Sequence, residues 1–106
     1  MGNNKTYRDF DVFQLALLRE SNHRVMSNPG LPLVERNHLA IIYDNSEINH
    51  VIKEKLSAMS IDQLEYNLNR ANNLILNNPD DNAAYVFLSD EIKLQLKIKL
   101  EQKFIR

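Results

Sequence analysis

Apolar residues recur at helical spacing in the first quarter of the chain. The recurring positions are Phe10, Phe13, Leu17, Leu18 and Val25. Spacings of three, four and seven residues are typical of a helix with one buried face. We therefore predict a helix over roughly residues 7–26, with Thr6 or Asp9 as its N-cap.

The next segment has a shorter and more mixed pattern. Between Pro32 and Tyr43 we predict a second helix, because proline suits a first helical turn. The polar run Asp44-Asn45-Ser46-Glu47 then supplies side chains that can cap a third helix. The apolar positions of that helix are Ile48, Val51, Ile52, Leu56 and Met59.

A fourth helix has the clearest start in the sequence. Ser60 and Gln63 form an S-x-x-Q capping box, and Met59 and Leu64 hold the positions of a hydrophobic staple. The apolar residues that follow at spacings of three and four predict a helix of about five turns with one apolar seam. The seam consists of Ile61, Leu64, Leu68, Ala71 and Ile75.

The tail of the chain is ambiguous between strand and helix. Over residues 92–100 apolar and polar residues alternate strictly, which is the period of a half-buried strand. The residue types favour a helix, because Leu, Lys, Gln and Glu are good helix formers, Asp80 and Asp81 can cap its start, and no partner strand is evident. Such a helix is apolar on two sides. One stripe holds Leu88, Ile92, Leu96, Leu100 and Phe104, and the other holds Phe87, Leu94, Ile98 and Ile105.

These elements predict an all-α fold, a small bundle of four to five helices with a long C-terminal helix. The chain has 106 residues, 43% of them apolar and 25% charged, which is typical of one globular domain over 1–106. We expect residues 1–5 to be flexible. Gly30 and the three prolines, Pro29, Pro32 and Pro79, place the strongest breaks near 27–32 and 77–82.

The second apolar stripe of the tail helix has two interpretations. In one, it lies on the surface and binds a twin chain or a different protein, because contiguous exposed apolar patches usually mark interfaces. In the other, the helix is central and buries both stripes. Under the first interpretation the predicted interface residues are Leu94, Lys97, Ile98 and Ile105.

Several kinds of chemistry have no support in the sequence. The chain has no cysteine, its serines lack a Gly-x-Ser-x-Gly elbow, and two glycines cannot build a phosphate-binding loop. We therefore predict neither an enzyme nor a cofactor. No apolar stretch approaches a membrane span and the first residues do not resemble a leader, so we expect a cytoplasmic protein without a membrane partner. Abundant Asn, Lys and Ile are typical of AT-rich genomes, including those of many phages and mobile elements.

The three histidines share one pattern, Glu-x-Asn-His. The pairs are Glu20 with His23, Glu35 with His38, and Glu47 with His50. Di-metal helical bundles use Glu-x-x-His from two helices, so a metal site is one hypothesis. The second and third copies are only a dozen residues apart, which does not fit long antiparallel helices. Surface contacts along a helix are the simpler interpretation.

Lysines near the C-terminus suggest a different partner. Lys93, Lys97, Lys99 and Lys103 could contact phosphates, which makes a small DNA-binding regulator the alternative function. Cations also collect at helix C-termini because the helix dipole favours them there. The net charge of −1 and the aliphatic residues between the lysines argue against nucleic acid.

The sequence therefore favours a non-enzymatic helical adaptor, inhibitor or regulator that binds another protein. Self-association through the C-terminal helix is compatible with this function. The composition suggests a phage or mobile-element origin.

Overall fold

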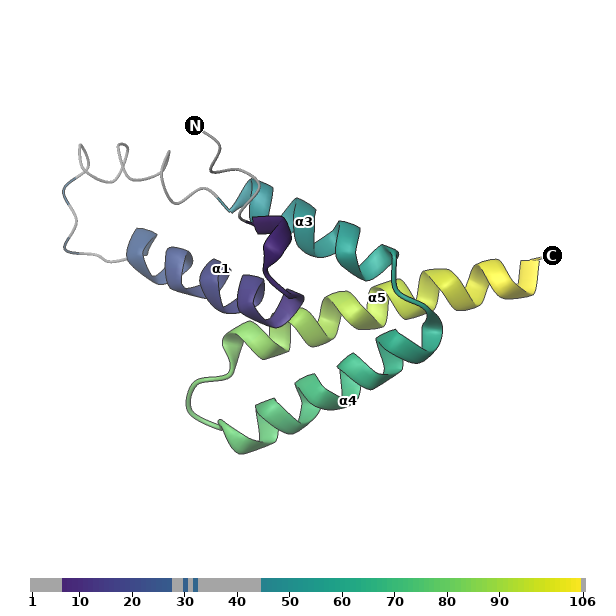
Figure 1. Ribbon diagram of the computed structural model, residues 1–106. Helices are drawn as coiled ribbons and strands as arrows, with labels where there is room; N and C mark the ends of the chain where they lie inside the picture. The colour runs from purple at the N-terminus through teal and green to yellow at the C-terminus, as the bar shows by residue number, and fades with distance from the viewer. Residues whose placement is uncertain (1–6, 28–29, 31, 33–44, 106) are drawn as a thin grey trace.

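The computed structural model describes residues 7–27, 30, 32 and 45–105, with side chains to residue 103 (Figure 1). The expected flexibility of residues 1–5 and the expected helix after Pro32 concern residues outside this set. The described part is all-helical, which confirms the predicted fold class. Its helices are α1 (Val12–Met26), α3 (Ser46–Ser57), α4 (Ile61–Asn77) and α5 (Ala83–Ile105). That the chain forms a single domain stays a prediction.

Helix α1 begins later than predicted. Residues 7–9 form a 3-10 turn, and the N-cap is Asp11 rather than Asp9. The Asp11 carboxylate accepts a hydrogen bond from the Gln14 amide at 2.8 Å, and the Gln14 side chain accepts one from the Asp11 amide at 3.0 Å. This reciprocal capping box satisfies two backbone donors that an uncapped start would leave unpaired.

The start of α3 uses its polar residues differently from the prediction. Asn45 holds the N-cap position, but its side chain makes no capping bond. It instead joins α1, accepting from Asn22 Nδ2 at 3.1 Å and donating to the carbonyl of Arg19 at 3.2 Å. Asn22 is buried, so this amide pair satisfies polar atoms inside the α1–α3 contact.

Helix α4 begins as predicted. The Ser60 hydroxyl accepts from the Gln63 amide, and the Gln63 side chain accepts from the Ser60 amide. Along the predicted seam Leu64 and Ala71 are buried, and Leu68 packs against the core. The helix is 17 residues long, which matches the expected five turns.

Helix α5 packs on both α1 and α4, and α4 runs antiparallel beside it (Figure 1). Residues 92–100 are helical, so the strand alternative is wrong. Ala84, Leu88 and Ile92 of α5 are buried in one core with residues of the other three described helices. Packing of the apolar residues that recur at helix spacing therefore favours a helix in this segment. This tertiary packing outweighs the strand-like alternation of apolar and polar residues.

The C-terminal end of α5 extends beyond α4. At 1.5 Å per residue, the 23 residues of α5 span about 35 Å, whereas the 17 residues of α4 span about 26 Å. In Figure 1 the yellow end of α5 extends past the ends of the other labelled helices. The core accordingly ends near Ile92, and the apolar residues that follow lie on a less covered part of the helix.

Candidate functional site

The exposed end of α5 is the leading candidate site. Leu94 is 47% exposed, and Ile98 and Leu100 are each 38% exposed, whereas Leu88 and Ile92 of the same helix are fully buried. Large aliphatic side chains lose hydrophobic stabilisation when they stay in water, at roughly 25 cal/mol per Å². Three such side chains are exposed within two turns of this helix, and exposed apolar patches often mark interfaces.

The exposed residues lie on two sides of α5. Leu94 and Ile98 belong to the predicted interface stripe, and Lys97 beside them is also exposed. The side chain of Ile105, the fourth predicted interface residue, lies outside the described side chains. Leu100 belongs to the other stripe, whose first members Leu88 and Ile92 are buried in the core.

A shallow, wide-open groove follows that second stripe along one face of α5. Its lining residues all belong to this helix and are Lys93, Leu96, Lys97, Leu100 and Glu101. Leu96 packs partly against the core, so the groove continues the core stripe onto the surface. We name this feature the α5 groove. From the sequence alone we would expect this stripe to be buried in the core. That its C-terminal part is exposed is known only from the structure.

The four lysines predicted for nucleic acid lie on both sides of an apolar stripe. Lys93, Lys97 and Lys103 are exposed and Lys99 is half-buried. At 3.6 residues per turn, Lys93 and Lys97 lie along one edge of the Leu96–Leu100 stripe, and Lys99 and Lys103 along the other. The lysines thus border an apolar strip from two sides instead of forming one basic face.

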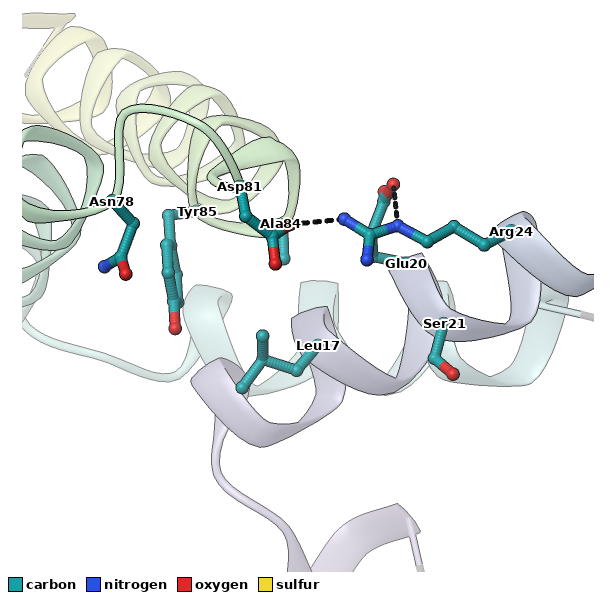
Figure 2. A pocket seen from close by; sticks show the side chains of 8 residues that line it. All are labelled: Leu17, Glu20, Ser21, Arg24, Asn78, Asp81, Ala84 and Tyr85. Atoms are coloured by element: carbon teal, nitrogen blue, oxygen red, sulfur yellow. Dashed lines mark hydrogen bonds and ion pairs between the residues drawn. The ribbon is translucent and has the colours of Figure 1, made fainter.

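A second pocket lies between α1, the α4–α5 connection and the start of α5 (Figure 2). Its volume is about 190 Å³. Arg24 dominates it, bonding to the Asp81 carboxylate and lying 3.5 Å from Glu20. Asp81 thus pairs with α1, whereas the sequence suggested a capping role. The hydrogen bond that Arg24 donates to the Asp81 carboxylate is the main cause that raises the pKa of Arg24. The guanidinium of Arg24 is paired with both carboxylates. The pocket therefore contains an ion-pair network that joins α1 to the α4–α5 connection.

The Glu-x-Asn-His segments are not brought together as a metal site. Glu20 pairs with Arg24, and His50 lies 3.3 Å from Glu54 rather than against Glu47. In neither of the two described copies does the Glu pair with its own His, so the predicted i,i+3 contacts are wrong there. Glu35 and His38 lie outside the described residues. Within the described part of the chain, no three His, Asp or Glu side chains gather as a metal ion would require.

An ion pair that joins the 3-10 turn to α3 could not be predicted from the sequence. Arg8 of the 3-10 turn pairs with Glu54 of α3, and Lys55 Nζ donates to the Arg8 carbonyl at 2.8 Å. The same Arg8 hydrogen bond is the main cause that lowers the pKa of Glu54. These contacts hold the residues before α1 on α3. Residues 46 positions apart give no local signal, so only the fold reveals them.

Comparison with known proteins adds no family. No protein-family model, curated protein or solved structure matches this chain. Among the described helices, none is long and apolar enough to cross a membrane. The geometry of α5 is therefore the basis on which a function can be argued.

Proposed function

We propose that this chain is a non-enzymatic helical protein that acts by binding another protein through the C-terminal half of α5. The observation that carries the proposal is the exposure of Leu94, Ile98 and Leu100 on a helix end that extends past the core. Burying these side chains against a partner recovers hydrophobic free energy that the isolated chain leaves unused. Under this proposal the protein acts as an adaptor, an inhibitor or a regulator in the cytoplasm.

Self-association is the first competing use of the same surface. Two copies that met along the Leu96–Leu100 stripe would bring Lys93, Lys97, Lys99 and Lys103 of one chain near those of the other. Like charges at an interface cost free energy, and only Glu101 offers compensation on this segment. The charge distribution therefore favours a different protein over a twin chain. Sedimentation equilibrium over a concentration series distinguishes the two, because only a homodimer gains mass with concentration.

Binding of DNA is the second competing use. It draws support from the exposed lysines, but they border two edges of an apolar strip. A phosphate-binding surface needs cations on one face, and its affinity falls steeply with salt. A salt-sensitive shift of duplex DNA would favour this alternative over protein binding.

Site-specific photo-cross-linking tests the proposal. A photoreactive residue is placed at Leu94 or Ile98, and at Leu76 of α4 as a control that is 76% exposed. We expect the positions on α5 to cross-link one discrete protein in the native host, and position 76 not to do so. Equal cross-linking from all three positions, or none from α5, would contradict the proposal.

A further inference from the structure

We infer that the α5 groove binds an amphipathic helix whose apolar stripe is bordered on both sides by Asp or Glu. This inference rests on the proposed function and adds the chemistry of the partner. It begins from the relation between the groove and the core. Leu88 and Ile92 are fully buried, Leu96 packs partly against the core, and Leu100 is 38% exposed. The stripe that α4 and the other helices cover at one end is therefore open at the other.

The open end presents one apolar face of a single helix. Leu96 and Leu100 are one turn apart on this face, and every residue that lines the groove belongs to α5. Spacings of one turn on both partners let a second amphipathic helix pack its apolar side chains between those of α5. The neighbouring α4 packs antiparallel along α5 (Figure 1).

The charges along the groove select the partner. Lys93 and Lys97 border one edge, and Lys99 and Lys103 border the other, on a helix with 3.6 residues per turn. Glu101 is the one acidic residue that lines the groove. Each long lysine stem can cover apolar surface while its ammonium group reaches out to a carboxylate. A helix with acidic residues on both flanks of its apolar stripe complements this pattern, and a basic helix is repelled.

The test uses three synthetic helical peptides of about 18 residues, roughly five turns each. The first has a leucine stripe bordered by Glu, the second has the same stripe bordered by Lys, and the third keeps Glu but replaces the leucines with Ser. Fluorescence anisotropy with the full chain gives the dissociation constants. We expect the Glu-bordered leucine peptide to bind at least about tenfold more tightly than either of the others. Raising the salt from about 0.15 M to about 1 M should weaken it, because the Debye length falls from about 8 Å to about 3 Å.

Matched variants locate the binding on the groove. Lys97→Glu should weaken the Glu-bordered peptide severalfold, whereas Lys53→Glu, the same change at an exposed site of α3, should leave it nearly unchanged. Leu100→Glu should weaken it as well, and Leu76→Glu on α4 should not. Circular dichroism of each variant verifies that the helices persist.

The contrary outcomes separate this inference from the proposed function. Equal binding of the Glu-bordered and Lys-bordered leucine peptides overturns the acidic partner and leaves apolar docking in place. No binding of any peptide, with a discrete cross-link still formed at Leu94, overturns the groove inference alone. Tighter binding of duplex DNA than of the acidic peptide overturns both.

Discussion

The guanidinium carbon of Arg19 lies 3.8 Å from the ring centroid of Phe87, which joins α1 to α5. Arg19 Nε also donates to Asn49 Oδ1 of α3 at 2.9 Å. One half-buried side chain of α1 thus contacts two other helices, α3 and α5. Cation-π contacts stabilise more as they are shielded from water, so this arginine is a structural residue rather than a surface charge.

Replacing Arg19 should destabilise the fold measurably. Arg19→Leu removes the contact with Phe87 and leaves Asn49 without its donor, at a cost of about 1–3 kcal/mol in the free energy of unfolding. The matched comparison is Arg70→Leu, because Arg70 lies 4.2 Å from the ring centroid of Phe13 but is exposed. Urea unfolding should show the smaller loss for Arg70. Equal losses would mean that the contacts with α3 and α5 add nothing.

The amide pair between Asn22 and Asn45 gives a second prediction. Asn22→Ala removes the donor to Asn45 Oδ1 inside the α1–α3 contact, which should cost about 1–3 kcal/mol. A double-mutant cycle with Asn45→Ala should give a coupling energy of at least about 0.5 kcal/mol. Strict additivity of the two substitutions would show that the pair contributes nothing beyond each residue alone.

The ion pair of Arg8 with Glu54 predicts a dependence of stability on pH. The hydrogen bond from Arg8 is the largest cause that lowers the pKa of Glu54 below its ordinary value of 4.5, with His50 adding a smaller attraction. A lowered folded-state pKa stabilises the fold above the unfolded-state pKa, and that contribution is lost as the pH falls through the folded-state value. The difference in unfolding free energy between the wild type and Glu54→Gln should therefore be present at neutral pH and shrink below about pH 4.5.

A control variant and a change of salt concentration test the same ion pair further. Glu65→Gln changes an exposed carboxylate of α4 and should give a smaller difference at neutral pH. Because Arg8 and Glu54 are both well exposed, about 1 M salt should also reduce the difference for Glu54→Gln. A difference that grows on acidification would reverse the sign and exclude the assignment.

The sequence predicted the helices better than it predicted their contacts. The Ser60–Gln63 capping box is a local signal, and it marks the start of α4 correctly. The Asp11–Gln14 box is the same kind of signal, so the true start of α1 was also present in the sequence. Residues 92–100 carry conflicting local signals, because strict alternation favours a strand whereas the residue types favour a helix. The helix that forms agrees with the residue types and with the lack of an evident partner strand.

The exposure of part of the candidate site could be predicted. Leu94, Lys97 and Ile98 are exposed, as the surface interpretation of the second stripe requires, and their role in binding stays a prediction. The α5 groove was not predicted, because Leu96 and Leu100 continue the core stripe without a break in the pattern. The exposure of Leu100 follows from the different lengths of α4 and α5 and from where the other helices end. Such tertiary facts have no local sequence signal.

The central claim is that Leu94 and Ile98 serve binding rather than folding. The most direct test is the free energy of unfolding of the double variant Leu94→Glu/Ile98→Glu, measured by urea titration and circular dichroism, with Ile92→Ala as the core reference. We expect the double variant to stay helical and to lose less than about 1 kcal/mol, because surface changes are nearly neutral. Ile92→Ala should lose about 2–5 kcal/mol. A double variant that unfolds, or that loses as much as Ile92→Ala, would show that this stripe belongs to the core and would contradict the account.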